Sequence, residues 1–418
     1  MGSSLRVLAV AWLGASVVLA SDWPTWRGPD GQGHASEKNP PLHWGPKENI
    51  AWKIPLPDEG NSTPILIGKR IFLTQATEKG KRRALWCLDR ATGKQLWTRE
   101  VTFTDKEPTH ATNPYCSASP VSDGEVVVVS HGSAGVFAYD LSGKELWKKD
   151  VGKLHHIWGN ASSPVLHGDL AIFWCGPGDR QFLLAVNRKT GAKVWQHDEP
   201  GGDLGKKRPW IGSWSTPLVV KASNREELLL GVPGKFKAFD PATGKELWHC
   251  SGLANQGKDE LVYTSPVYAD GIAVALAGFS GGGVAVRTGG SGDISATHRV
   301  WEQPAPNPQR IGSPVIVGPH LFLVNEPGSA QCWDLKTGKE VWRKDRLLDS
   351  TWGSLVEAGG KLFATSRTGT TVVFEAGPRF VQVARNAIGE PVYASPVICD
   401  GQLFLRSYRH LWCFGSNK

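Results

Sequence analysis

The sequence has too few cysteines, in the wrong spacing, to build a disulfide framework or a haem site. Its seven cysteines are an odd number, no two of them are adjacent, and no pair is spaced as Cys-x-x-Cys. A small domain held together by disulfides and a protein with a Cys-x-x-Cys-His haem site are therefore excluded. One incidental disulfide in an oxidising compartment is compatible with the sequence.

Long hydrophobic runs are almost missing as well. The one such run, Val7 to Ala20, follows Arg6 and has an ending suited to cleavage before Ser21. It is shorter than the roughly 20 residues that cross a bilayer, so residues 1–20 are predicted to be a cleaved signal peptide. We expect no transmembrane segment and, because no cysteine follows the cleavage site, no lipid anchor. The predicted location is periplasmic or secreted.

Concentrated positive charge is scarce, although the formal net charge is +8. The only dense basic runs are Lys79–Arg83 and Lys206–Arg208, and the other lysines and arginines are spread over repeated turns. Nucleic-acid binding needs a continuous basic face. No nucleic-acid partner is therefore expected.

Helical periodicity is absent too, and a nine-residue phrase recurs in its place, as in Asp240-Pro-Ala-Thr-Gly-Lys-Glu-Leu-Trp248. The phrase predicts a short hairpin loop in which Asp or Asn bonds the backbone and the glycine adopts a positive φ. The strand that follows starts in fixed register, so its tryptophan always lies on the same face. Other copies of the phrase end at Trp97, Trp147, Trp195 and Trp342.

Ser or Thr followed by proline marks the start of each repeat unit, and the count is eight. A small residue precedes every one of these Ser or Thr residues, which indicates crowding near an axis. Each unit then reads as four short β-strands separated by tight turns, the composition of one propeller blade. The prolines are Pro64, Pro120, Pro164, Pro217, Pro266, Pro314 and Pro396, and Ser354-Leu355 holds the same place in one unit.

These units predict an all-β fold, an eight-bladed β-propeller of four-stranded antiparallel blades over residues 49–418. A strand at Asn49–Leu56 precedes the first unit without a partner, and the last unit stops at Leu411–Phe414 without a fourth strand. Pairing of these two segments would close the ring and remove two open sheet edges. Residues 21–48, rich in Trp, Gly and Pro, are predicted to be an extension packed over one face.

The repeated tryptophans are predicted to pack between neighbouring blades, and two units depart from the regular repeat. Blade seven carries Val383 in place of the tryptophan, which predicts the weakest contact between blades. In blade five, Gly281–Asp293 replaces the usual turn. Its glycines predict that the backbone passes close to another loop or to a ligand.

Units that open with Ser-Pro and close with Asp-x-x-Thr-Gly-Lys-x-x-Trp resemble the pyrroloquinoline-quinone (PQQ)-type β-propeller repeat, over about residues 49–414. The resemblance implies one of two branches: quinoprotein dehydrogenases, which hold PQQ on the propeller axis, or non-enzymatic propellers similar to the outer-membrane assembly factor BamB. Quinoprotein alcohol dehydrogenases carry an adjacent cysteine pair over the cofactor, and this chain has none. No calcium-ligand set or catalytic Asp matches either, so we expect no cofactor, with PQQ and Ca²⁺ as the alternative. BamB-type proteins are lipoproteins, and the acylated cysteine is missing here.

The candidate site lies where the chain enters the axial end of each blade. Two positions before each Ser or Thr, four of the residues are aromatic. We expect them to form an arc on one side of the central opening that stacks on a sugar, a quinone or a peptide ring. The alternative is that the rings only fill the opening. They are Trp214, Tyr263, Trp352 and Tyr393.

Loops that enter the same end add further candidates. The adjacent histidines could bind metal or polarise a ligand, although neighbours on an extended chain point in opposite directions. An arginine beside aromatic rings fits an anionic or glycan ligand. Structural hydrogen bonds and a solvated rim charge are the alternatives, and no metal ligand or catalytic residue is assigned. The residues concerned are His155, His156, Trp158, Asn160, Trp210 and Arg310.

The sequence therefore favours an exported, monomeric propeller that serves as a non-catalytic binding or scaffolding module through its axial face. The expected partner is an envelope protein or a glycan. The alternative is an oxidoreductase of the quinoprotein type, or another envelope enzyme, with its active site at the same face.

Overall fold

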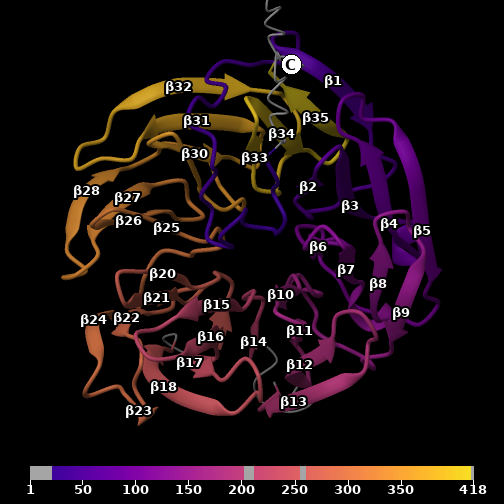
Figure 1. Cartoon of the computed structure of the whole chain (residues 1–418). Coiled ribbons are helices and arrows are strands. Elements are labelled where there is room, and N and C mark those ends of the chain that lie inside the picture. The colour runs from indigo at the N-terminus through magenta and orange to yellow at the C-terminus, as the bar shows by residue number, and fades with distance from the viewer. Residues whose placement is uncertain (1–20, 202–210, 255–259, 416–418) are drawn as a thin grey trace, which may run out of the picture.

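The computed structural model describes residues 21–201, 211–254 and 260–415, and their regular secondary structure is almost entirely β-strand. The strands form eight antiparallel sheets set around a central axis like the blades of a propeller (Figure 1). The eight-bladed fold predicted from the repeats is confirmed. No helix in the described ranges has the length and apolar character to span a bilayer.

The blades follow the chain in order, and each begins with its innermost strand. Blade one is β2 (Ile65–Ile67), β3 (Arg70–Thr77), β4 (Arg82–Asp89) and β5 (Gln95–Thr102), with the 3-10 turn η1 (Glu78–Gly80). Blade two is β6 (Val121–Ser122), β7 (Val126–Ser130), β8 (Val136–Asp140) and β9 (Glu145–Lys149), with η2 (Gly132–Ala134). Blade three is β10 (Val165–His167), β11 (Leu170–Cys175), β12 (Gln181–Asn187) and β13 (Lys193–Glu199). Blade four is β15 (Leu218–Lys221), β16 (Glu226–Val232), β17 (Gly234–Phe239) and β18 (Glu246–Leu253).

The second half of the ring repeats this arrangement. Blade five is β20 (Val267–Ala269), β21 (Ile272–Leu276), β22 (Gly283–Arg287) and β24 (Arg299–Gln303). Blade six is β25 (Val315–Val317), β26 (His320–Val324), β27 (Ala330–Asp334) and β28 (Glu340–Lys344). Blade seven is β29 (Val356–Ala358), β30 (Lys361–Thr365), β31 (Thr370–Glu375) and β32 (Gln382–Ala387). Blade eight is β33 (Val397–Cys399), β34 (Gln402–Arg406), β35 (His410–Phe414) and β1 (Ile50–Pro55). A short parallel pair, β14 (Ile211–Ser213) and β19 (Glu260–Val262), lies outside the blades.

The ring closes through blade eight, where the first strand of the propeller pairs with the last. Strand β1 runs antiparallel to β35, with Trp52 opposite Cys413 and Ile54 opposite Leu411. The predicted pairing is therefore confirmed. It leaves no open sheet edge between the two ends of the array.

A second ring of hydrogen bonds closes around the axis and explains why Ser or Thr stands in every unit. The backbone N–H of each of these residues donates to the side-chain hydroxyl of its counterpart in the following blade. Ser395 in blade eight donates to Thr63 Oγ1 in blade one at 3.2 Å, which completes the circle. The other links are Thr63–Ser119, Ser119–Ser163, Ser163–Thr216, Thr216–Ser265, Ser265–Ser313, Ser313–Ser354 and Ser354–Ser395.

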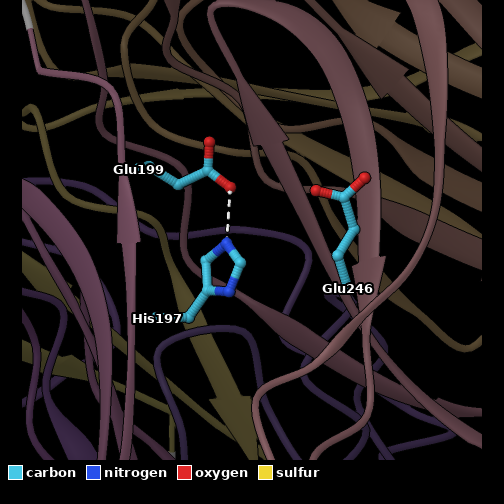
Figure 2. A group of neighbouring side chains, drawn as sticks. All are labelled: His197, Glu199 and Glu246. Carbon is cyan, nitrogen blue, oxygen red and sulfur yellow. Dashed lines mark hydrogen bonds and ion pairs between the residues drawn. The ribbon is translucent and has the colours of Figure 1, made fainter.

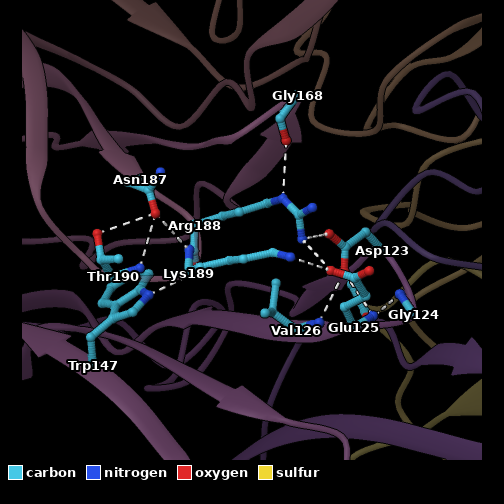
Figure 3. A network of polar contacts seen from close by, with 11 residues as sticks. Asp123, Gly124, Glu125, Val126, Trp147, Gly168, Asn187, Arg188, Lys189 and Thr190 are labelled. Atoms are coloured by element: carbon cyan, nitrogen blue, oxygen red, sulfur yellow. Dashed lines mark hydrogen bonds and ion pairs between the residues drawn. The ribbon is translucent and has the colours of Figure 1, made fainter.

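Each repeated tryptophan packs across the seam to the next blade, as predicted. Trp147 on β9 donates its Nε1–H to the carbonyl of Arg188 at 2.8 Å, in the turn of blade three. Gly191 of the same turn has φ of +71°, and a Cβ there would lie 2.7 Å from the Trp147 ring, so both the turn and the seam require glycine. On the surface of this seam, the Arg188 guanidinium pairs with Asp123 and with Glu125 (Figure 3).

The extension, residues 21–48, passes across the axis at the end of the propeller opposite the Ser and Thr entry loops. Trp23 pairs with Leu66 in blade one, and His34 pairs with Glu357 in blade seven. Between them, the Arg27 side chain is 3% exposed and donates to the carbonyls of Ser313 and Pro314 at 3.2 and 2.6 Å. The extension therefore ties distant blades together.

Candidate functional site

A cavity of about 570 Å³ opens on the axis at the end where the Ser and Thr segments enter the blades. The residue two positions before the Ser or Thr lines this cavity in all eight blades, so the repeat itself determines much of the wall. Four of these residues are the predicted aromatic arc. The eight are Asn61, Ser117, Ala161, Trp214, Tyr263, Ile311, Trp352 and Tyr393.

The aromatic residues form two groups of rings in contact. In one group, the Trp214 ring lies 6.0 Å from Trp158 and 5.3 Å from Tyr263, measured between centroids. In the other group, the Trp352 and Tyr393 centroids are 5.3 Å apart in an edge-on arrangement. Such contacts fix the rings in place, so the wall is held before any ligand arrives.

The second group is supported from behind by residues that the sequence did not single out. Tyr408 stacks on Tyr393 with centroids 4.7 Å apart and an angle of 11° between the rings. The Arg367 guanidinium donates to the Tyr393 hydroxyl at 2.8 Å and lies 5.7 Å from the Trp352 ring. Arg367 and Tyr408 occupy the same repeat position, and in both blades its backbone N–H bonds back to the entry loop, but the residue type at this position differs from blade to blade and so carries no repeat signal.

The opposite side of the cavity is polar and comes from blades one and two. Asn61 donates through Nδ2 to the Thr112 carbonyl at 2.9 Å, and no partner is recorded for its Oδ1 atom. His110 Nδ1 and Thr112 Oγ1 are 2.8 Å apart. Asn113 and Ser117 complete this side. The cavity therefore has an aromatic side and a side of amides, hydroxyls and one imidazole.

Trp26 of the extension also lines the cavity and separates it from a second cavity of about 280 Å³. The second cavity lies between the extension and strands β10 and β15. Beside Trp26, burial lowers the pKa of Arg27 to about 10, which leaves its guanidinium charged at neutral pH. Phe279 is a further residue of the lining that the sequence did not mark, and half of its surface is exposed.

The remaining predicted residues lie elsewhere. His156 is buried with its ring edge-on to Trp214 at 4.8 Å, and burial lowers its pKa to about 4. Arg310 is 2% exposed and lies over the Trp333 ring, so it does not project from the rim. Asn160 donates to Glu107 Oε1 at 2.6 Å, beside a separate small cavity.

His155 also lies outside the lining, against the backbone of Gly178. Trp210 lies outside the described residues.

The charge of the lining bears on whether the cavity fits PQQ. The cofactor carries three carboxylates and, in the quinoprotein branch, works with Ca²⁺, which binds through carboxylate and carbonyl oxygens. Among the described residues that line the cavity there is no Asp, Glu, Lys or Arg. The described lining therefore offers amide carbonyls but neither a carboxylate ligand for Ca²⁺ nor a cationic partner for the carboxylates of PQQ.

One group elsewhere resembles a metal site: His197, Glu199 and Glu246, whose ligand atoms lie within 4.8 Å of one another (Figure 2). The Lys237 ammonium already occupies it, at 2.7 Å from Glu199 and 3.0 Å from Glu246. Lysine supplies the positive charge that a cation would bring, so the group is a partly buried ion-pair network between blades three and four.

The repeat that builds these walls matches a known family over residues 82–344, described as outer membrane protein assembly factor BamB. The chain belongs to this family. The BamB of Burkholderia pseudomallei is 26% identical over 239 residues, which are 54% of this chain and 55% of that protein. The BamB of Shewanella oneidensis is similar at 26% identity over 54% of each chain. The chain thus spans about half the length of these curated relatives.

The second branch is also present among the relatives. A quinoprotein ethanol dehydrogenase of Pseudomonas aeruginosa is 30% identical over 145 residues, 32% of this chain and 22% of that protein. Solved structures of both branches share the fold. BamB from Moraxella catarrhalis gives a TM-score of 0.64 at 14% identity, over 88% of this chain and 99% of that chain. Quinohemoprotein alcohol dehydrogenase from Comamonas testosteroni gives 0.64 at 14% identity, over 95% and 81%. Similarity at this level establishes the propeller fold. It does not identify a ligand, which has to be inferred from the residues that line the cavity.

Proposed function

We propose that this protein is an exported, non-catalytic binding module whose axial cavity holds an uncharged segment of a glycan or of an envelope protein. The observation that carries the proposal is the composition of the cavity. Its described lining combines aromatic rings with amides and hydroxyls and contains no carboxylate, ammonium or guanidinium group. Acid–base catalysis most often uses histidine or a carboxylate, and a catalytic metal needs several such ligands, whereas the described lining offers His110 alone.

The family supports the same proposal. The matching family description names an outer membrane protein assembly factor, a role that a binding module fits. A preformed concave site with a few polar groups is also the usual form of a small-ligand pocket. The described lining lacks the donors for PQQ, so no reaction step is assigned to a quinone.

The proposal is tested by retention of a ligand from an envelope extract on the immobilised protein. We expect a glycan or protein that is retained by the wild type and lost with Phe279→Ala and with Trp352→Ala. The matched control is Leu96→Ala, an exposed apolar side chain on the outer strand β5. Its retention should equal that of the wild type.

Two results would contradict the proposal. One is a ligand retained equally by the wild type and both cavity variants, which would place binding elsewhere on the propeller. The other is a rise in melting temperature with PQQ and Ca²⁺ together with dye-linked dehydrogenase activity, which would make the protein an enzyme.

A further inference from the structure

The two unlike sides of the axial cavity indicate which class of ligand it takes. We infer that the cavity binds a neutral oligosaccharide, an inference that rests on the proposed binding function and names its ligand. A pyranose ring has two faces of C–H bonds and an edge of hydroxyl groups. Such a molecule needs a flat apolar surface on one side and hydrogen-bonding groups on the other, and the cavity supplies both.

The aromatic side fits the C–H faces of sugar rings. Trp158, Trp214 and Tyr263 form one group of rings, and Trp352 and Tyr393 form another. Their positions derive from blades three, four, five, seven and eight, so the apolar surface extends around most of the opening. Rings held by neighbouring rings lose little further freedom when a ligand stacks on them, and this preorganisation favours binding.

The polar side fits the hydroxyl edge. Hydroxyl groups both donate and accept hydrogen bonds, so a wall that offers both kinds of group pairs with them. Ser117 Oγ donates to the Pro114 carbonyl at 2.6 Å and keeps its acceptor capacity. Asn61, Thr112 and His110 line the same side and offer an amide, a hydroxyl and an imidazole. A purely apolar ligand would leave these groups without partners, at a cost.

The neutrality of the lining excludes charged sugars as the preferred class. A uronate or phosphate group that enters the cavity gives up its hydration, and no cationic side chain in the described lining compensates for the loss. Two cations lie just outside the lining and are already engaged. Arg27 donates to the carbonyls of Ser313 and Pro314. Arg367 donates to the Tyr393 hydroxyl and pairs with Glu326 at 3.7 Å. Neutral sugars therefore bind in preference to acidic ones.

The inference is tested by isothermal titration calorimetry with neutral tri- to hexasaccharides from cellulose, amylose, xylan, mannan and chitin. We expect at least one of them to bind. Removing a stacking surface should weaken that binding roughly tenfold or more, so Trp352→Ala and Phe279→Ala should both show the loss. Trp352→Phe keeps a flat ring and should retain part of the affinity.

Two controls separate stacking from damage to the fold. Tyr268→Ala removes an aromatic ring outside the cavity and should leave binding unchanged, because Tyr268 donates to the Lys221 carbonyl at the other end of the blades. Oligogalacturonides of matched length should bind at least tenfold more weakly than the best neutral sugar. The melting temperature of every variant shows whether the fold is intact.

The outcomes distinguish the ligand class from the function. If no neutral oligosaccharide binds, or if binding survives both cavity variants, the sugar inference is overturned. If no sugar binds but a protein segment from the envelope extract is retained through Trp352 and Phe279, the proposed function stands and only the ligand class is wrong. If PQQ with Ca²⁺ binds and confers dehydrogenase activity, both are overturned.

Discussion

Six of the eight seams between neighbouring blades make the same tryptophan contact, and the other two are formed by different residues. At the regular seams, the tryptophan of one blade donates its Nε1–H to a backbone carbonyl in the turn of the next. The six tryptophans are Trp52, Trp97, Trp147, Trp195, Trp301 and Trp342. At the seams between blades four and five and between blades seven and eight, no such turn is present, and the chain uses other groups.

Between blades four and five, a buried carboxylate takes the place of the turn carbonyl. Glu227 is fully buried and accepts from Trp248 Nε1 at 2.9 Å, from the Gly289 N–H at 3.1 Å and from Arg225 Nε at 2.9 Å. The chain after β22 then adds β23 (Gly292–Asp293) as a fifth strand beside β18. The glycine-rich segment thus approaches a strand of the neighbouring blade, where the sequence predicts another loop or a ligand.

Between blades seven and eight, the extension supplies the missing ring. The turn is absent because the two ends of the propeller meet there. Trp44 is 3% exposed and lies between Phe363 of blade seven and Phe414 of blade eight, with centroids 6.3 and 6.0 Å away. The seam is therefore filled by Trp44, although blade seven carries Val383 in place of the repeated tryptophan. The comparison teaches that the seam needs a large apolar ring, while its hydrogen-bond partner can change.

Removing a ring from a regular seam should have the largest effect. Trp195→Ala leaves a cavity between blades three and four and should lower the free energy of unfolding by about 4 kcal/mol. Urea denaturation measures this change in the free energy of unfolding. Val194→Ala, at a neighbouring position that is 50% exposed, is the control and should cost less than about 0.5 kcal/mol. Equal losses from the two variants would show that the tryptophan does not hold the seam.

Removing the carboxylate from the seam between blades four and five should have the next largest effect. Glu227→Ala removes the acceptor of the Trp248 indole N–H, of the Gly289 N–H and of Arg225 Nε, at a cost of about 3 kcal/mol. The control is Glu226→Ala, whose carboxylate pairs with His167 at the surface and should be worth less than about 1 kcal/mol. If Glu227→Ala costs no more than its control, the carboxylate does not replace the turn.

Replacing tryptophan by phenylalanine should separate the two kinds of seam. Trp147→Phe loses a ring and the hydrogen bond to Arg188, whereas no partner is recorded for the Trp44 Nε1 atom. We expect Trp147→Phe to cost about 1 kcal/mol more than Trp44→Phe in urea denaturation. A larger loss at Trp44 would mean that its N–H makes a bond of its own.

The surface ion pairs of a regular seam should matter least. Arg188→Ala removes the pairs with Asp123 and Glu125, which lie at the surface (Figure 3). The expected loss is about 0.5 kcal/mol, because water and salt screen exposed pairs. It should shrink further at high salt. A loss that is large and independent of salt would indicate that the Arg188 stem packs the seam instead.

The candidate site, like the seams, contains residues at a repeated position and residues that have no equivalent in the other blades. Trp214, Tyr263, Trp352 and Tyr393 were predicted from one repeat position, and all four line the cavity. Arg310 was predicted at the rim from its place in a loop, and it is buried. The repeat predicts where a residue lies when the same position recurs in every blade. A loop between two blades does not recur, so the sequence does not predict which way its side chains point. Whether the cavity holds a ligand stays a prediction.

The sequence by itself determined the number of blades, the closure of the ring and the aromatic wall, because these follow from a local repeat: turn chemistry sets the register, and the register sets the face of each side chain. Only the tertiary structure decided that Trp44 fills the last seam, that Arg27 crosses the axis and that Glu227 receives Trp248. The first two contacts join segments far apart in the chain, and the third lies within blade four. Such contacts depend on which surfaces remain uncovered after the blades have assembled into the closed ring.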